Sequence, residues 1–487
     1  MSPISIFICL VSYFAVLMLV SYLTGRNSTN EGFFLANRKS PWYLIAFGMI
    51  GSSISGVTFV SVPGAVKAGG FTYYEFVLGL VLGYWIIAWV LMPVYYRLQL
   101  TSIYTYLKTR FGYFGYKTGA SYFLLSRIIG ASFRIYVAVD VLQNCIFNQW
   151  NVNFVVSASV IVILIWLYTR SGGMKTIIWT DALQTFFLLA ALVGSIILIS
   201  QSMHLHIGDL AKTVTDSSYS KMFDWDYKSK FYFFKQFFSG VFIAIAMTGL
   251  DQDMMQKNLT CKTIGESQKN IFSFSIIQAV VVLMFLALGA LLYLYVEANH
   301  ITLPAKPDDL YPMLATGGTF GIVVAFLFVM GITAASFASA DSALTALTTS
   351  FCVDILDIKE REKEKQESTR KNVHMIMAVA LIVVIVIYRI INDPSIINVV
   401  YKVAGYTYGP LLGLYSFGLL TKVKANDKWI PAICLLAPII CYILDSQSKV
   451  WFNGYQFGFE LLIMNALLTF IGLLLSASSI KKEEVYG

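Results

Sequence analysis

The sequence predicts an all-α membrane protein that crosses the bilayer many times. The chain has 487 residues, of which 57% are hydrophobic and only 13% are charged, and its mean hydropathy is +0.69. A soluble protein of this length would carry about twice that share of charged residues. Apolar stretches of about 20 residues recur along the whole chain, and this is the length that an α-helix needs to cross a bilayer.

We expect about thirteen spans, each long enough to cross as a helix. The first stretch has no basic residues before it and no small-residue cleavage pattern after it, so we expect it to be a retained helix and not a signal peptide. The predicted spans are residues 2–24, 41–66, 74–97, 116–148, 152–169, 174–203, 229–256, 268–297, 319–356, 372–392, 397–420, 428–446 and 455–478.

Lysine and arginine residues in the connections predict the orientation of the chain. With the N-terminus outside, the inner connections hold most of these residues, including Arg38, Arg97, Lys257 and the charged stretch 359–371. The outer connections hold far fewer, mostly in residues 204–235, and long loops count little in the positive-inside rule. The sequence therefore predicts a multi-pass protein of the plasma (inner) membrane with its N-terminus outside and its C-terminus inside.

Several function classes are disfavoured by the sequence. It contains no nucleophile–base pair, HExxH motif or P-loop that would predict an enzyme. The net charge of +8 describes topology and not a nucleic-acid surface. The six cysteines are scattered without paired spacing, so neither disulfides nor a metal site follow from them. We therefore expect no enzymatic cofactor, no nucleic-acid partner and no obligate protein partner.

The second predicted span has an unusual composition at membrane depth. The stretch "GMIGSSISGVTFVSVP" (48–63) is dense in glycine and hydroxyl residues and poor in strong helix formers. Such a helix can break at mid-membrane and offer carbonyl oxygens to ions and substrates, as in secondary transporters. The alternative is a small-residue face that lets helices pack closely. The residues favour the two interpretations about equally.

A carboxylate in the stretch "AASFASADSALTALTTSF" (334–351) points to ion binding. Asp341 lies there among the hydroxyls of Ser336, Ser339, Ser342 and Thr345. Ionisable groups within membrane spans are costly and are functional candidates by default. Hydroxyls, a carboxylate and the carbonyls of a broken helix together form a set of hard oxygen ligands that suits a small alkali cation.

Three further ionisable residues fall within predicted spans and bear on function. Arg127 and Arg134 are seven residues apart, which is almost two helical turns, so both should face the inside of the bundle. Asp181 lies nearer the start of its helix, where a helix-dipole role is the alternative to ion binding.

Four stretches together resemble the sodium/solute symporter family, whose members share the LeuT-type inverted-repeat fold with one additional N-terminal helix. They lie in the family's order over some 250 residues, with Lys257 where the family usually has arginine. The stretches are "GGMKTIIWTDALQ" (172–184), "GLDQDMMQKNLTCK" (249–262), "AASFASADSALTALTTSFCVDIL" (334–356) and "YTYGPLLGLYSFGLL" (406–420).

The resemblance implies one transmembrane transporter domain over residues 1–487 that works by alternating access. Its parts would be the extra helix 2–24, inverted repeats over 41–203 and 229–420, and C-terminal helices over 428–478. The function implied is Na⁺-coupled import of a small organic solute, with Na⁺, the solute and the lipid bilayer as partners. The alternatives are a proton-coupled carrier using Asp341, a substrate-gated channel, and a membrane sensor.

The resemblance also implies two sodium sites. The family's common site would take the carbonyls of Gly51, Ile54 and Ala335 and the hydroxyl of Ser339, while Ala338 replaces a usual serine. A second sodium, held by some members, would lie at Asp181, Asp341 and Ser342. The family normally has Ser or Thr at the position of Asp341, so this carboxylate either adds an anionic ligand or takes up a proton.

The stretch "SGVTFVSVP" (55–63) is most similar to bacterial sodium-coupled sialic acid transporters and to sodium-coupled monocarboxylate transporters. This likeness implies a substrate carboxylate held by Ser55, Thr58 and an arginine, with Arg127 the better aligned and Arg134 the alternative. The glutamine that supports this site in helix two of the family has no counterpart in "VLGLVLGYW". A sugar or inositol is the alternative substrate. The expected substrate-binding residues are Ser55, Thr58, Phe59, Tyr73, Phe76, Arg127 and Arg134.

Overall fold

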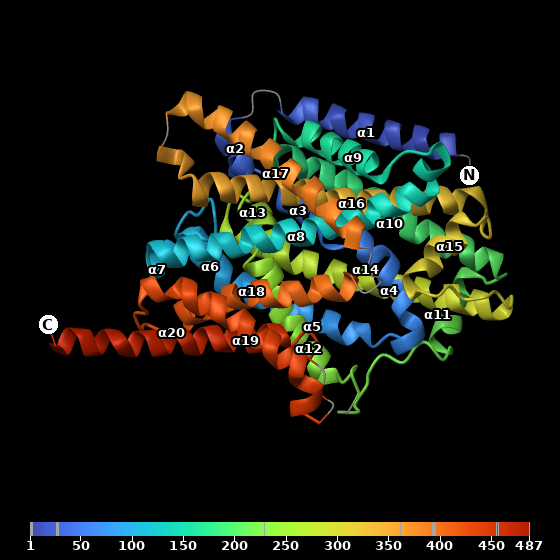
Figure 1. The fold of residues 1–487 in the computed structure, drawn as a ribbon. Helices are drawn as coiled ribbons and strands as arrows, with labels where there is room; N and C mark the ends of the chain where they lie inside the picture. The colour runs from blue at the N-terminus through green and yellow to red at the C-terminus, as the bar shows by residue number, and fades with distance from the viewer. Residues whose placement is uncertain are drawn as a thin grey trace.

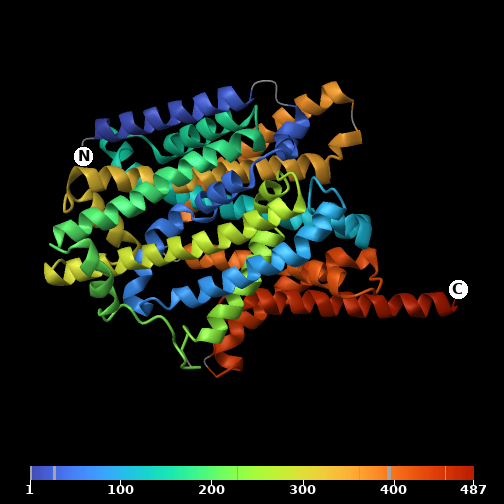
Figure 2. The ribbon, with the colours of Figure 1, turned by 180° about the vertical axis from the view of Figure 1, so that it is seen from behind.

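The helices of the computed structural model lie side by side and run roughly along one common direction (Figures 1 and 2). The structure describes residues 3–25, 29–227, 229–360, 362–391, 396–453, 455 and 457–486, and within these ranges it contains no named β-strand. The N-terminal end of α1 and the C-terminal end of α20 lie at opposite ends of the bundle. This placement agrees with an odd number of spans, and which end faces outside stays a prediction.

Each predicted span coincides with one helix, with consecutive helical segments or with a bent pair. The helices are α1 (Pro3–Gly25), α2 (Asn30–Leu35), α3 (Trp42–Ser53), α4 (Gly56–Gly69), α5 (Tyr73–Ile86), α6 (Met92–Arg97), α7 (Thr105–Arg110), α8 (Tyr113–Cys145), α9 (Phe154–Thr169), α10 (Met174–Ser202), α11 (Ile207–Thr215), α12 (Phe233–Ala244), α13 (Gln252–Asn258), α14 (Ile264–Ala298), α15 (Leu310–Thr316), α16 (Gly321–Ser350), α17 (Lys363–Ile391), α18 (Ile396–Leu420), α19 (Ile430–Trp451) and α20 (Leu461–Tyr486).

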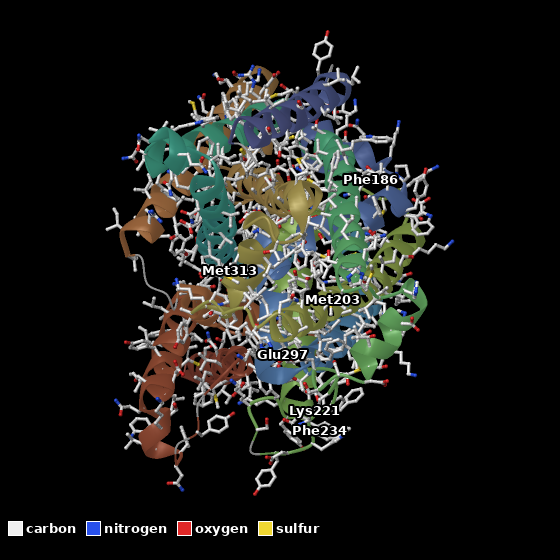
Figure 3. The ribbon with its side chains drawn as sticks, turned by 90° about the vertical axis from the view of Figure 1, so that its right-hand side faces the viewer. Phe186, Met203, Lys221, Phe234, Glu297 and Met313 are labelled. Atoms are coloured by element: carbon white, nitrogen blue, oxygen red, sulfur yellow. The ribbon has the colours of Figure 1, made fainter. Side chains whose placement is uncertain are left out.

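The prediction of an all-helical membrane protein is confirmed. Eight described helices are long and apolar enough to cross a membrane, and two bent pairs bring the number to as many as ten. Two shorter apolar helices, Phe154–Thr169 and Leu461–Ala477, accompany them. Large apolar side chains such as Phe186 lie exposed on the outside of the bundle, where lipid would cover them (Figure 3). The exact number of spans stays a prediction.

The first bent pair is the glycine-rich and hydroxyl-rich span. Helices α3 and α4 meet at an angle of 63°, and Ile54 and Ser55 between them have extended backbone. Of the two interpretations of this stretch, the structure therefore contains the break. Close packing is present as well, because the amide of Gly51 donates to Thr185 Oγ1 on α10 over 3.0 Å.

The second bent pair was not expected, because residues 229–256 read as one apolar span. Helix α12 continues through a π-helical stretch (Ile245–Gly249) and then turns by 72° into α13. Asp251 lies at the turn, and its side chain accepts a hydrogen bond from the amide of Asp253. This cap satisfies one of the donors that a new helix start leaves open. Each half of the chain therefore begins its core with a broken helix.

Small residues set the contact between α5 and α12. A Cβ atom at Gly79 would lie 1.9 Å from the carbonyl oxygen of Phe237, and one at Gly240 would lie 2.1 Å from that of Phe76. Gly83 similarly faces Ala244, so both helices carry two small residues four apart. This pattern lets helix backbones approach closely within a membrane.

We predict that Gly79→Ala lowers the apparent melting temperature of the purified protein. Alanine favours an isolated helix over glycine by about 1 kcal/mol, so destabilisation would show that the close contact dominates. Overpacking of this kind costs about 1–3 kcal/mol. The matched control is Gly265→Ala in α14, where an added Cβ meets nothing within 4 Å. Equal melting temperatures of the two variants would contradict the prediction.

Candidate substrate and ion site

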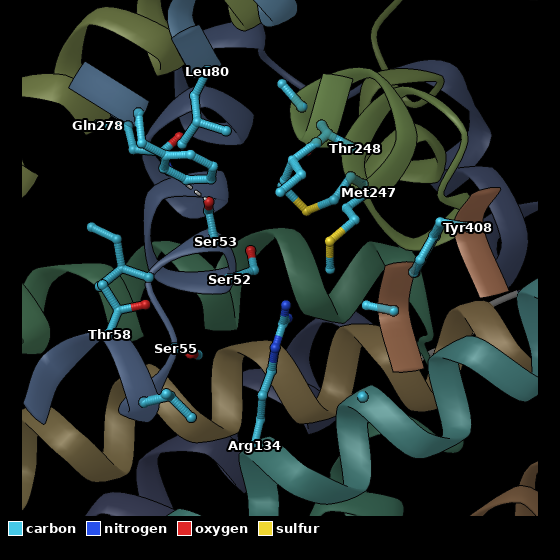
Figure 4. A pocket seen from close by; sticks show the side chains of 18 of the residues that line it. Ser52, Ser53, Ser55, Thr58, Leu80, Arg134, Met247, Thr248, Gln278 and Tyr408 are labelled. Carbon is cyan, nitrogen blue, oxygen red and sulfur yellow. Dashed lines mark hydrogen bonds between the residues drawn. The ribbon is translucent and has the colours of Figure 1, made fainter. Parts of the chain in front are cut away.

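The break between α3 and α4 borders a cavity of about 160 Å³, which we call the central cavity. Side chains from the two bent pairs and from α5, α8, α14 and α18 surround it (Figure 4). Its polar lining consists of Ser52, Ser53, Ser55, Thr58, Tyr73, Tyr84, Ser126, Arg127, Arg134, Thr248, Gln278 and Tyr408.

The structure brings most of the expected substrate-binding residues to this cavity. Ser55, Thr58, Tyr73, Phe76, Arg127 and Arg134 all line it. Phe59 does not. Successive residues of a helix point about 100° apart, so Phe59 turns away from the cavity that its neighbour Thr58 faces. Its ring is buried instead against aromatic rings of other helices, namely those of Phe285, Tyr311 and Phe328.

The two arginines play different parts in the structure. Arg134 projects from α8 into the central cavity toward Ser52 (Figure 4). Arg127 forms ion pairs with Asp253 and, over 3.5 Å, with Asp251. The hydroxyl of Tyr408 on α18 donates to Asp251 as well. Arg127 and Tyr408 therefore tie α8 and α18 to the start of α13. Arg134 is the arginine whose guanidinium projects into the cavity (Figure 4).

Gln278 is a cavity residue that the sequence analysis did not single out. Its amide nitrogen donates to Ser53 Oγ over 2.9 Å, while its Oε1 is buried with no hydrogen-bond partner among the described residues. Buried polar atoms are normally paired. In the sequence, its position at the cavity is signalled only by a single amide side chain inside the apolar run "SIIQAVVVLMF" of α14. Helix α14 thus brings a glutamine amide to the cavity, while "VLGLVLGYW" of the second core helix offers none.

The residues of the expected common sodium site come together around the first break. Ser339 on α16 is buried, and its Oγ donates to the carbonyl of Ser52 over 2.9 Å and to that of Ala335 over 3.3 Å. Gly51 and Ile54 flank this carbonyl in the chain, and Ala338 contributes no hydroxyl. The available ligands are neutral oxygens, which fits a singly charged hard cation.

The three residues of the expected second sodium site are also neighbours. Ser342 links the two carboxylates, because its Oγ lies 3.4 Å from Asp181 Oδ2 and its amide donates to Asp341 Oδ1 over 2.6 Å. The hydroxyl of Tyr168 donates to Asp341 Oδ2 over 2.9 Å. Both carboxylates are buried, so Asp181 is enclosed by other helices although it lies near the start of α10.

A lysine completes this group, although its position in the sequence predicts an inner connection. Lys257 counted among the basic residues of the inner connections, but it is only 1% exposed. Its Nζ lies 2.6 Å from Asp181 Oδ2 and 2.5 Å from Ser52 Oγ. The sharp turn into α13 carries Lys257 back into the bundle. We call Lys257, Asp181, Asp341, Ser52 and Ser342 the buried ion cluster.

A second and larger cavity of about 1070 Å³ adjoins the central cavity on its predicted outer side. The two share Ile243, Met247 and Ala404 as lining residues. We call it the outer vestibule. Part of its wall comes from α19 and from residues 457–462, and the rings of Phe459 and Phe76 are 5.4 Å apart where the two cavities meet.

Buried hydrogen bonds close the opposite end of the bundle. Asp354 at the end of α16 accepts from the hydroxyls of Ser102 and Ser350 over 2.7 and 2.6 Å. Tyr95 and Tyr104 donate to the carbonyls of Gly249 and Leu250, just before α13. These bonds hold the described helices together at the end of the bundle opposite to the outer vestibule.

Comparison with known proteins decides the family. The model of the sodium:solute symporter family matches residues 33–428. The chain belongs to this family. Among curated relatives, the sodium/sialic acid symporter NanT of Aliivibrio fischeri is 22% identical over 92% of this chain and 89% of its own length. SiaT of Proteus mirabilis, a sodium/sialic acid symporter, is 24% identical over 91% and 90%. Sodium-coupled monocarboxylate transporter 1 of Xenopus laevis is 24% identical over 84% and 67%.

A solved structure shares the fold of this symporter. It is the substrate-bound outward-open state of a Na⁺-coupled sialic acid symporter, with a TM-score of 0.82, 21% sequence identity and coverage of 97% of both chains. The LeuT-type fold is thereby confirmed. The chain is a Na⁺-coupled symporter of the inner membrane with several spans. Members of its family are transporters and not enzymes, and Na⁺ serves as the coupling ion.

We predict that Ser339→Ala raises the Na⁺ concentration for half-maximal uptake by this symporter about fivefold, since one hydrogen-bonding oxygen is worth about 1 kcal/mol. The matched control is Thr348→Val on the same helix, which removes a hydroxyl bonded to Leu344 and His374. Uptake measured against Na⁺ concentration checks this. An unchanged Na⁺ dependence in Ser339→Ala would exclude Ser339 as a ligand.

Proposed function

We propose that this symporter imports a small solute that carries a carboxylate, such as sialic acid, together with Na⁺. The observation that carries the proposal is the guanidinium of Arg134 in the central cavity beside the break that presents Ser55 and Thr58. Guanidinium and carboxylate form short, charge-assisted and often bidentate pairs, and these select planar anions. Hydroxyl and amide groups around the arginine supply donors for the rest of a polar solute.

Two relatives support this choice of substrate class. NanT and SiaT are named sodium/sialic acid symporters, and each aligns with more than nine-tenths of this chain. In the present symporter Gln278 and Ser53 add an amide and a hydroxyl on the wall of the cavity. Such groups would bind the hydroxyls of a sugar acid. The aromatic rings of Tyr73 and Phe76 cover the outer side of the cavity and would exclude water from the bound solute.

We further propose that residues 41–203 and 229–420 are inverted repeats that alternate access to the central cavity. In support, each of these segments opens with a broken helix, α3–α4 in one and α12–α13 in the other. Interrupted helices at corresponding positions of two halves are typical of such transporters. Each Na⁺ that moves inward down a potential of about 100 mV releases about 2.3 kcal/mol, which drives uptake of the solute.

A smaller carboxylate is the second candidate, and the size of the cavity favours it. The central cavity holds about 160 Å³, whereas pockets for drug-sized ligands measure about 300–1,000 Å³. A sugar acid would require the walls to move apart, while a monocarboxylate would not. One relative is named a sodium-coupled monocarboxylate transporter. Thermal stabilisation of the purified protein by each class of carboxylate, in Na⁺ and in choline, separates the two candidates.

We predict that Arg134→Ala weakens binding of the anionic substrate roughly 100-fold, because it removes the charged partner of the carboxylate in a desolvated cavity. Arg134→Lys keeps the charge but loses the bidentate geometry, so we expect an intermediate affinity. Calorimetry on the purified variants measures both effects.

Arg127→Lys serves as the comparison, because it keeps a cation beside Asp251 and Asp253. Loss of binding in Arg127→Lys with full binding in Arg134→Ala would assign the carboxylate to Arg127. Full binding in both alanine variants, Arg127→Ala and Arg134→Ala, would point to a neutral substrate such as a sugar or inositol.

A further inference from the structure

The position of Lys257 is the starting point. Its side chain is 2% exposed and comes from α13, the short helix after the second break. Its ammonium group contacts Asp181 Oδ2 over 2.6 Å and Ser52 Oγ over 2.5 Å. A buried ammonium is tolerated only when it is paired and hydrogen-bonded. Both partners are therefore required for the lysine to lie where it does.

The ammonium lies where a second coupling cation would have to bind. Asp181 Oδ2 is the oxygen that also approaches Ser342 Oγ, and Ser342 in turn contacts Asp341. Asp341 interacts electrostatically with both Asp181 and Lys257. A Na⁺ ion placed on the same carboxylate oxygen would meet a fixed positive charge at close range. Inside a protein, where the effective dielectric constant is low, such repulsion is strong.

We propose that the ammonium of Lys257 takes the place of a second Na⁺ at Asp181, so that this symporter binds and moves a single Na⁺ in each cycle. That ion binds at the first break, near Ser339. The inference rests on the Na⁺ coupling described above and specifies its stoichiometry.

The lysine also connects the two broken helices. The hydroxyl of Ser52 accepts a hydrogen bond from the Lys257 ammonium, and the backbone carbonyl of Ser52 accepts one from Ser339 Oγ. Lys257 on α13 therefore fixes the backbone next to the first break, where the Na⁺ ligands lie. A covalently attached cation provides this contact at every Na⁺ concentration, whereas a bound second ion would provide it only when present.

Removal of the ammonium should create the site that it fills. Asp181 Oδ1 has no hydrogen-bond partner among the described residues, and without Lys257 its Oδ2 loses a cation. Two carboxylates and the hydroxyls of Ser52 and Ser342 would then face a space about as large as an ammonium group. Such a set of hard oxygen ligands binds a small alkali cation.

The test is the number of ²²Na⁺ ions bound per molecule of purified full-length protein. We expect one for the wild type, one for Lys257→Arg and two for Lys257→Met, which keeps the length of the side chain. The double variant Lys257→Met/Asp181→Asn removes both charges and should return to one. Charge moved per substrate in proteoliposomes should rise by one in Lys257→Met alone.

The outcomes separate the proposals. No saturable Na⁺ binding to the wild type would contradict the Na⁺ coupling itself. Two ions per wild-type molecule, or a folded Lys257→Met that still binds one, would overturn the role of Lys257. If Lys257→Met folds only in Na⁺ and not in choline, as followed by its melting temperature, the result supports the proposal. If Lys257→Met folds in neither Na⁺ nor choline, the number of Na⁺ ions bound per wild-type molecule tests the proposal: one ion supports it and two overturn it.

Discussion

The hydrocarbon core of a bilayer contains no water to satisfy backbone groups, so a helix can break there only where neighbouring side chains replace its lost hydrogen bonds. Two spans of this symporter are broken in this way, α3–α4 and α12–α13. At the first break, Thr185 bonds to the amide of Gly51 and Ser339 bonds to the carbonyl of Ser52. At the second, Tyr95 and Tyr104 bond to the carbonyls just before α13. The central cavity and the expected sodium ligands depend on these bonds, because they replace the backbone hydrogen bonds that are lost at each break.

Much of the fold was predictable, because periodic apolar stretches reflect the thickness of the bilayer and little else. Glycine and hydroxyl residues at 48–63 allowed a break there, because strong helix formers are scarce, but they favoured a close-packing face equally. The seven-residue spacing of Arg127 and Arg134 correctly placed both at one cavity, because it depends only on helix geometry. Family motifs supplied Ser339, Asp181 and Ser342, which the structure brings together at the breaks.

What the sequence did not reveal depends on contacts between distant segments. The second break has no composition signal as dense as the first, and the turn that it makes buries Lys257, which hydropathy places in a connection. Gln278 reaches the cavity from an apolar stretch of α14. Phe59 was expected at the site as an aromatic residue for a gate or stacking wall, but its ring points from α4 away from the cavity that Thr58 lines. A linear motif carries none of this information.

Part of the wall of the outer vestibule lies beyond residue 428, where the match to the family model ends. The family model ends at residue 428, whereas Tyr442, Lys449 and Phe459 line the vestibule from α19 and the segment before α20. The entrance is thus lined partly by residues that lie beyond the match to the family model. A substitution in α19 therefore changes the lining of the entrance without changing any expected ion ligand, since all of these lie before residue 343.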